Sequence, residues 1–518
     1  MHASINQSKR GEQIMPYYVL PFNIEESKNS ESLTSFVGLF PYLDLLSRLN
    51  FFELSDKYVN VHGGNQGWLD SQLLLSMLFI NLSGGDCPDD IKRLESDSGL
   101  CKGIISLEKN LLGKKKYAAL GSRFRKGRKG CFASANSIRT YLESFHNEAE
   151  EGNREFGKCY IPKANNHLFG INRLMPPLLG FMQLNRPVTT ATLDLDATIV
   201  ESNKSEALYS YKKGKGYQPL NVWWYEQHLV VHSEFRDGNV KSGFENKRVF
   251  CDALNDLPSG INEVYLRADS EGYQYNLLDY CENGENERFG KIGFAIGIDI
   301  VDGFRKDVAR LSEDEWHPIY KTLGNGVKVK SHQEWAEVSY VGRLNSPDYR
   351  YIAIRERAEI QGSLPGMEVQ KELSFPNYGI GGVTYKLSGL VTNLNWNGEE
   401  VIHWYRKRCG DSELAHSIMK SDLTGGRLPS GKFGANACWW AVMILALNLH
   451  EMLKRLALPS RWHNRRLKSL RYWFIGVAGR VEKKGGQFKI ILNKGREVFK
   501  MFIEARKRIA SLKPLPGG

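Results

Sequence analysis

The sequence predicts an α/β protein built on a mixed β-sheet, with a mostly helical N-terminal region and a β-rich insertion. Residues 190–200 alternate apolar and polar side chains, which is the period of a half-buried strand. Two more strand patterns, a helix, a strand, a second helix and a final strand follow before residue 300. Three strands in close succession predict antiparallel pairing, and strands separated by helices predict parallel crossovers.

The elements follow from apolar periodicity and from Gly, Pro and Asp breaks. N-terminal helices are expected at 68–93, 133–146 and 167–182. Core strands are expected at 190–200, 221–225, 228–235, 264–268 and 292–300, with helices at 249–257 and 273–281. Insertion strands are expected at 327–331, 336–341, 349–355 and 382–386, and the last helices at 399–421 and 435–455. These elements divide the chain into regions 1–186, 187–300, 301–390, 391–457 and 458–518.

Composition excludes several classes of protein. Of the 518 residues, 42% are hydrophobic and 25% are charged, which is ordinary for a globular protein and not for a disordered one. The longest nearly apolar run, 439–449, is too short to span a membrane, and no apolar stretch follows Lys9 and Arg10 as in a secretory signal. The eight cysteines form no C-x-x-C pair, so neither a zinc ribbon nor a disulfide framework is indicated. We expect a cytoplasmic protein without a membrane partner.

The net charge of +12 is concentrated in two places. Residues 453–513 hold 18 basic and 3 acidic residues, and residues 114–129 hold eight basic residues and no acid. Basic segments on an otherwise balanced chain favour a polyanionic partner, which in the cytoplasm is usually nucleic acid. A solvated surface is the alternative for either segment alone.

Carboxylates stand at three informative positions. Asp194 and Asp196 share one face of the first core strand, Asp269 follows the fourth strand, and Glu413 lies on the helix after the insertion. Converging carboxylates are ligands for Mg²⁺ or Mn²⁺. Two such ions can activate a water and stabilise the leaving oxygen of a phosphodiester. Each residue alone has a plainer explanation: an ion pair, a helix N-cap or a surface charge.

Three segments together resemble the catalytic blocks of DDE transposases from bacterial insertion sequences. They are LDLDAT (193–198), RADS (267–270) and YRKRCGDSELAHSIMK (405–420). The likeness is greatest to the subgroup with a β-strand insertion in a ribonuclease H-like, retroviral-integrase-like core and a Y-R-E-K signature. Residues 67–97 are also similar to the N-terminal region of that subgroup, so the resemblance covers about residues 65–455.

The resemblance implies a metal-binding triad of Asp196, Asp269 and Glu413, with Tyr405, Arg408 and Lys420 as helpers near the DNA backbone. It also favours Asp196 over Asp194, which the residues alone leave open. The 144 residues between Asp269 and Glu413 exceed what an uninterrupted core needs, and the β-rich insertion accounts for the excess.

The spacing around Glu413 departs from the signature by one residue. At about 100° per residue, Arg408 lies about 140° from Glu413 on a regular helix, whereas Arg406 lies only about 20° away. Either Gly410 interrupts the helix or Arg406 takes the role of Arg408.

We therefore expect a transposase that binds the terminal inverted repeats of its own element, as a homodimer on double-stranded DNA associated with the nucleoid. It would use two Mg²⁺ or Mn²⁺ ions for cleavage and strand transfer, with no organic cofactor and no small-molecule substrate. The expected DNA contacts are Lys114, Lys115, Lys116, Arg123, Arg125, Lys126, Lys212, Lys213, Lys215, Arg465, Arg466 and Lys468. The alternatives are a metal-dependent nuclease on the same core, without strand transfer, and an inactive DNA-binding or repressor protein.

Overall fold

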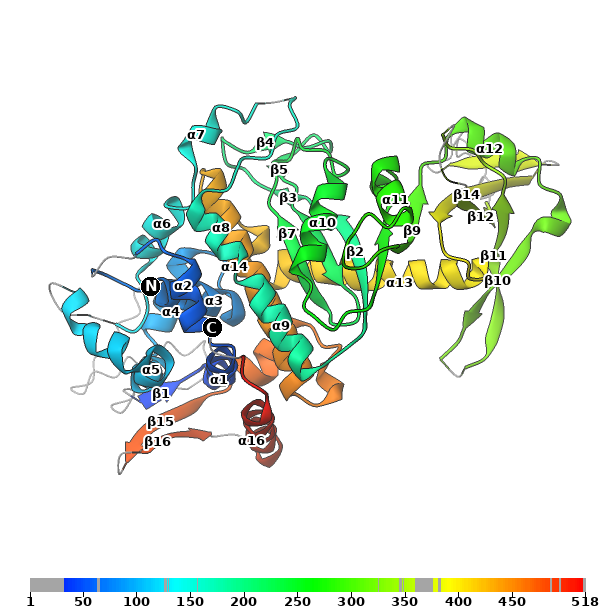
Figure 1. Ribbon diagram of the computed structural model, residues 1–518. Helices are drawn as coiled ribbons and strands as arrows, with labels where there is room; N and C mark the ends of the chain where they lie inside the picture. The colour runs from blue at the N-terminus through cyan, green and yellow to red at the C-terminus, as the bar shows by residue number, and fades with distance from the viewer. Residues whose placement is uncertain are drawn as a thin grey trace, which may run out of the picture.

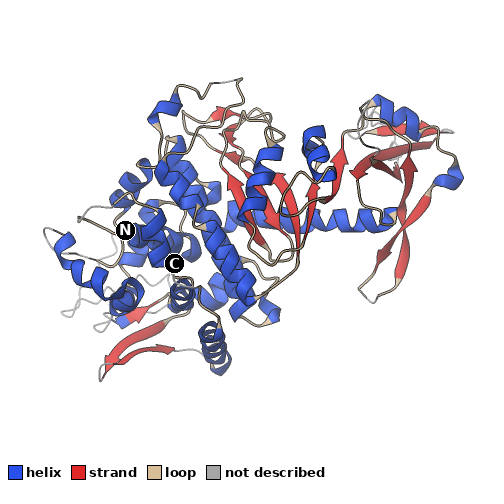
Figure 2. Cartoon of the chain, in the orientation of Figure 1, coloured by secondary structure: helices blue, strands red, loops and turns tan. Residues whose placement is uncertain are grey.

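The computed structural model describes most of the chain. The described residues are 32–62, 66–124, 128, 130–155, 157–324, 326–343, 347, 349–358, 376–380, 383–484, 487–492 and 495–515. The N-terminal helices and the C-terminal helix lie at one end of the molecule, the core sheet lies in the middle, and the insertion forms the other end (Figure 1). Figure 2 shows mostly helix at the first end, and strands mainly in the core sheet and the insertion.

Five strands form the core sheet in the predicted order. They are β2 (Thr190–Ala197), β6 (Leu220–Trp224), β7 (Leu229–Glu234), β8 (Glu263–Ala268) and β9 (Gly293–Ile298). β2 pairs antiparallel with β6, and β6 antiparallel with β7, whereas β2, β8 and β9 run parallel. The parallel connections contain α10 (Asn246–Asp256) and α11 (Tyr275–Glu282). The prediction of a mixed, ribonuclease H-like sheet is confirmed.

A small second sheet lies between β2 and β6 along the chain. It consists of β3 (Val200–Glu201), β4 (Leu208–Tyr209) and β5 (Lys215–Tyr217), in the order β3-β5-β4. Strands of two or three residues are too short to show an alternating pattern, so sequence periodicity does not reveal them.

The insertion continues the core sheet. It contains α12 (Asp302–Val308), β10 (His317–Thr322), β11 (Lys328–Val338), β12 (Arg350–Arg357), β13 (Asn377–Ile380) and β14 (Val383–Thr392). β14 pairs antiparallel with β9, so the whole sheet has the order β10-β11-β12-β14-β9-β8-β2-β6-β7, with β13 paired to β14. The two strands expected at 327–331 and 336–341 are one long strand, β11, which pairs with both β10 and β12.

Two long helices follow the insertion. α13 (Gly398–Ser417) contacts β2, β9 and β11 and ends in a π-helical turn, Ile418–Asp422. α14 (Phe433–Met452) is apolar on nearly all sides, which is typical of a helix in the core. With its π-helical extension to Ala457, α14 is long and apolar enough to span a membrane, but 94% of its apolar window is buried inside the protein.

The N-terminal region is mostly helical, as predicted. Its helices are α1 (Phe40–Arg48), α2 (Phe51–Tyr58), α3 (Asp70–Ser83), α4 (Ile91–Glu95), α5 (Ser98–Ala119), α6 (Ala135–Glu143), α7 (Glu148–Glu151), α8 (Asn166–Asn172) and α9 (Met175–Asn185). The helix expected at 167–182 is two helices, because Pro176 and Pro177 begin a new helix at α9.

The basic C-terminal region folds back onto the N-terminal one. It contains α15 (Leu467–Leu470), which continues as a π-helical turn to Ile475, then β15 (Gly479–Lys484), β16 (Gln487–Leu492) and α16 (Arg496–Ser511). β15 pairs with β1 (Leu33–Thr34), and α16 packs on α1. The same hydrophobic core therefore includes residues from both ends of the chain.

Candidate active site

The ends of β2 and β8 bring Asp196 and Asp269 to one edge of the sheet. The two strands are parallel, with Leu195 opposite Ala268. Asp196 is the next residue of β2, and Asp269 is the residue directly after β8. Side chains in register on parallel strands leave the same face, so the two carboxylates lie side by side. Burial raises the pKa of Asp269, and the negative charge of Asp196 raises it further. The site therefore contains a close pair of like charges.

Asp194 points from the same face of β2 but is engaged elsewhere. Arg267 Nε donates to Asp194 Oδ1 at 2.6 Å, and Arg267 Nη2 donates to Asp194 Oδ2 at 2.8 Å. Both side chains are fully buried. Burial raises the pKa of Asp194, and the guanidinium of Arg267 opposes that shift. Because both of its carboxylate oxygens accept from Arg267, Asp194 does not offer a free oxygen to a metal ion, and Asp196 is the better candidate.

Arg267 also holds α13 against the sheet. Its Nη1 donates to the backbone oxygen of Trp404 at 2.6 Å, and its guanidinium lies 5.1 Å from the ring centre of Trp404 and 4.7 Å from that of Tyr225. Cation–π contacts of this kind are typical of arginine between aromatic rings. The sequence shows Arg267 beside Asp269 but carries no signal of this pairing.

Tyr405 and Arg408 approach the aspartate pair from α13. Arg408 Nη1 lies 3.3 Å from Asp196 Oδ2, and its guanidinium lies over the ring of Tyr405. Burial would lower the pKa of Arg408, but Tyr405, Asp196 and Asp269 together raise it. The Tyr405 hydroxyl reaches Gly297 on β9, where a Cβ atom would stand only 3.0 Å from it. The structure thus groups Asp196, Asp269, Tyr405 and Arg408.

Arg406 faces away from this group. α13 continues without interruption through Gly410, yet the side chain of Arg406 donates to Gln333 Oε1 of β11 at 2.7 Å. The expectation that a regular helix would turn Arg406 toward the site is therefore wrong. Its premise was that the arginine and Glu413 share one helix face, whereas Arg408 is buried beside Asp196 and Glu413 is exposed.

His416 on α13 is a further neighbour of the site. Its Nδ1 lies 3.8 Å from Asp196 Oδ2, and its Nε2 lies 3.3 Å from Asn221 Nδ2 on β6. Burial lowers the pKa of His416 to about 4, and the positive charges of Lys420 and Arg408 act in the same direction. The sequence offers one indication that His416 is near the site, because it lies about one helical turn after Glu413.

Glu413 and Lys420 line an open hollow next to the aspartate pair. The hollow has a volume of about 410 Å³, and its other walls are Thr198, His416, Ser417 and Ser421. The negative charge of Glu413 opposes the lowering of the pKa of His416 by burial. Among the residues that the structure describes, no three His, Cys, Asp or Glu side chains lie close enough together to hold a metal ion. Glu413 thus shares a hollow with His416, which lies 3.8 Å from Asp196, but it does not form a three-carboxylate cluster with the two aspartates.

The donor set of the aspartate pair fits a hard divalent cation. Both groups are carboxylates, and the mutual repulsion that raises the pKa of Asp269 is what a cation between them would relieve. Arg408 supplies the positive charge at Asp196 in this structure.

The N-terminal basic patch is partly structural. Lys114 and Lys115 are exposed, but Lys116 forms an ion pair with Asp56 at 2.8 Å. Arg123 Nε donates to the backbone oxygen of Gly67 at 2.8 Å. Arg125 and Lys126 lie outside the described residues.

The other expected DNA contacts lie at two surfaces. Lys212 and Lys213 stand in the turn between β4 and β5, and Lys215 opens β5 beside the ring of the half-exposed Tyr209. Arg465 and Lys468 are exposed in the C-terminal region. Arg466 instead pairs with the buried Asp422 at 2.6 Å, so it anchors the π-helical turn after α13.

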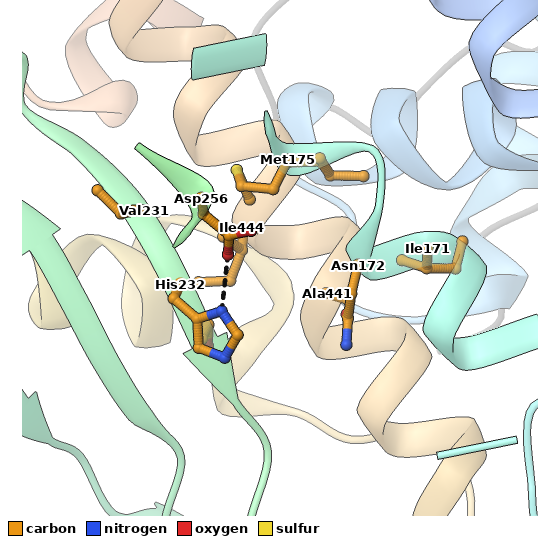
Figure 3. A pocket seen from close by; sticks show the side chains of 10 residues that line it. Ile171, Asn172, Met175, Val231, His232, Asp256, Ala441 and Ile444 are labelled. Carbon is orange, nitrogen blue, oxygen red and sulfur yellow. Dashed lines mark hydrogen bonds and ion pairs between the residues drawn. The ribbon is translucent and has the colours of Figure 1, made fainter. Parts of the chain in front are cut away.

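A small pocket between β7, α8, α9 and α14 is a poor candidate for an active site. It has a volume of about 30 Å³ and mostly apolar walls, including Ile171, Met175 and Ile444. His232 Nδ1 and Asp256 Oδ2 form an ion pair there at 2.9 Å (Figure 3). These two groups satisfy each other, and none of the predicted catalytic residues lines the pocket.

Comparisons with known proteins identify the family of the chain. Residues 68–514 match the family described as Transposase DDE domain group 1, and the chain belongs to that family. DDE transposases generally use divalent metal ions. No curated protein matches the sequence. Among solved structures, the chain is similar to a piggyBac transposase in a synaptic complex with hairpin DNA. The identity is 9% and the TM-score 0.38, over 92% of this chain and 86% of that one.

Proposed function

We propose that this chain is the transposase of a bacterial insertion sequence, which cleaves DNA at the terminal inverted repeats of its element and joins the freed 3′-hydroxyl to target DNA. The observation that carries the proposal is the pair Asp196 and Asp269 at one sheet edge, with Tyr405 and Arg408 against it. Membership of the DDE transposase family supports the same reaction class.

The proposed metal ligands are Asp196, Asp269 and Glu413. Two Mg²⁺ or Mn²⁺ ions held there would activate a water or 3′-hydroxyl and stabilise the leaving oxygen of the phosphodiester. Glu413 would reach the aspartates from the rim of the neighbouring hollow. Lys420 on the same rim and Arg408 beside Asp196 supply positive charge for the DNA backbone.

The proposed partner is double-stranded DNA. Exposed lysines and arginines in the β4–β5 turn and the C-terminal region would neutralise phosphates. Because both ends of an element must meet, the active form is proposed to be a homodimer on DNA, associated with the nucleoid.

The test uses a plasmid that carries the gene's flanking DNA, purified full-length protein, and Mg²⁺ or Mn²⁺. We expect cleaved ends and joined product. Asp196→Asn, Asp269→Asn and Glu413→Gln should each lose both products while binding the ends, and Asp252→Asn, a partly exposed acid on α10, is the control. Cleavage without joined product would instead identify a nuclease, and end binding without cleavage an inactive DNA-binding protein. Full cleavage by Glu413→Gln would remove Glu413 from the triad.

A further inference from the structure

A second pocket, here called the α13 pocket, lies beside the C-terminal part of α13. It has a volume of about 180 Å³. Leu414, Ala415 and Ile418 form one wall, and Trp223 and His228 of the β6–β7 hairpin form another. The segment 463–466 completes its lining, so the pocket joins the core sheet to the basic C-terminal region. Its volume has room for several water-sized groups.

The α13 pocket carries an excess of positive charge. Four cations line it: Lys454, Arg455, Arg465 and Arg466. Its lining contains one carboxylate, Glu451, whose oxygens lie 2.6 Å from Lys454 Nζ and 3.4 Å from Arg455 Nε. Asp422 outside the lining pairs with Arg466. Four cations against these two carboxylates leave a net charge of +2 in this described part of the chain.

His228 lies within this positively charged surrounding. Burial lowers its pKa to about 3, and Arg455, Arg186 and Lys454 lower it further by repelling a proton. His228 also has a left-handed backbone, with φ at 56°, which is uncommon for a residue with a side chain. Strained conformations of this kind cluster at ligand sites.

Two ring nitrogens in the pocket lack partners. Trp223 is only 6% exposed, yet its Nε1 has no hydrogen-bond partner among the described residues, and the same holds for His463 Nε2. A buried donor without an acceptor costs about 1–3 kcal/mol, so such groups usually meet a ligand or water. The indole Nε1 can only donate, which calls for an acceptor in the pocket.

We propose that the α13 pocket binds a phosphate group of the DNA backbone, with Trp223 Nε1 donating a hydrogen bond and Arg455 and Arg465 supplying charge. Arginine, lysine and ring N–H donors suit an oxyanion with several acceptor oxygens. α13, about 10–12 Å across, separates this pocket from the hollow at Glu413, so a strand passing both would place phosphates a few nucleotides apart. That the phosphate belongs to DNA rests on the proposed function, whereas the binding of a phosphate group by this pocket does not.

The first experiment measures binding of inorganic phosphate to the full-length protein by titration calorimetry, with chloride keeping the ionic strength constant. Trp223→Phe removes one N–H group and should weaken phosphate binding about tenfold. Arg465→Gln, at an exposed position, should weaken it similarly. The matched control is Trp439→Phe, because Trp439 Nε1 is also buried without a described partner but lies outside the pocket. Saturable binding that neither Trp223→Phe nor Arg465→Gln weakens, or no saturable binding, overturns the proposal.

The second experiment identifies the source of the phosphate. A 30-base-pair duplex should displace phosphate from the wild-type protein and from Asp196→Asn, which leaves the α13 pocket intact. A duplex that binds while phosphate stays bound overturns the DNA source and assigns the pocket to free phosphate. If the wild-type protein shows phosphate displacement by the duplex but no cleavage of its DNA ends, the proposed reaction is refuted and the pocket is not.

Discussion

Asp194 and Arg267 form a bidentate ion pair that is fully buried. This pair connects β2 to β8, the two strands that position the candidate metal ligands Asp196 and Asp269. Asp194 precedes Asp196 by two residues on β2, and Arg267 precedes Asp269 by two residues on β8. The remaining guanidinium nitrogen of Arg267, Nη1, donates a hydrogen bond to the backbone oxygen of Trp404 on α13. The spacing of Asp196 and Asp269 thus depends on a buried contact next to them.

Removing one member of that pair should destabilise the fold. Asp194→Ala leaves the Arg267 guanidinium buried without its counter-ion, which costs about 3–5 kcal/mol in comparable buried pairs. We expect a large loss of unfolding free energy in urea. Asp196→Ala, two residues along the same strand, should lose much less because Asp196 is partly exposed. Equal losses for the two variants would contradict the division of roles between the aspartates.

Divalent cations should stabilise the folded protein through Asp196 and Asp269. At a hundredfold excess over its dissociation constant, a bound ligand adds about 2.7 kcal/mol. Mg²⁺ or Mn²⁺ should therefore raise the Tm, and chelation should reverse the rise. Asp269→Asn should abolish the rise, whereas Asp194→Asn should lower the starting Tm and keep the rise. A rise that survives Asp269→Asn would place the cation elsewhere.

Arg408 and Arg406 should differ sharply in cleavage assays. Arg408 contacts Asp196, and Arg406 contacts Gln333 in the insertion. Loss of one charged group that stabilises a transition state typically costs about 100-fold in rate. We expect a loss of that order for Arg408→Ala and less than about tenfold for Arg406→Ala. The reverse ranking, with both variants folded by circular dichroism, would refute the placement of Arg408.

Stability should fall in mild acid because of His228. Its pKa is about 3 in the folded protein, below the usual value near 6.5, so between these values the unfolded chain binds the proton and the folded chain does not. Unfolding free energy then decreases as pH falls, by about 1.4 kcal/mol per pH unit for one such group. His228→Asn tolerates the left-handed backbone and should make the decline shallower. The control is His332→Asn on β11. If the unfolding free energy of His228→Asn falls as steeply with decreasing pH as that of the wild-type protein, His228 is not the cause of the acid sensitivity.

We expect the exposed cations of the C-terminal region to contribute to the salt dependence of DNA binding. Arg461 and Lys468 are exposed, so reversing both charges should flatten the logarithmic salt slope by up to about 1.8. The loss should be similar for end and random DNA, because phosphate contacts carry no sequence information. Arg466 is unsuitable for this test, since it anchors Asp422. Lys92→Glu on α4 is the control. If the double variant keeps the wild-type salt slope, Arg461 and Lys468 do not contact DNA phosphates.

The order of the core elements could be predicted because each strand and helix carries its own periodicity. Asp196 and Asp269 could be placed at one edge because parallel strands carry side chains in register. The sequence placed Asp194 and Asp196 on one face of the strand without separating their roles, because the α13 helix that contacts β2 and the burial of Asp194 leave no mark on the strand pattern. The pairings of Arg267 and His416 depend on tertiary contacts between distant segments, which local spacing does not encode.

The pairing of β14 with β9 also affects the solubility of the protein. Without the insertion, the apolar strand Gly293–Ile298 would lie at an open sheet border with unpaired N–H and C=O groups. Such borders pair with other molecules and start aggregation. The insertion therefore also shields the core from intermolecular strand pairing, and a truncated chain that lacks it would be expected to precipitate and not simply to lose activity.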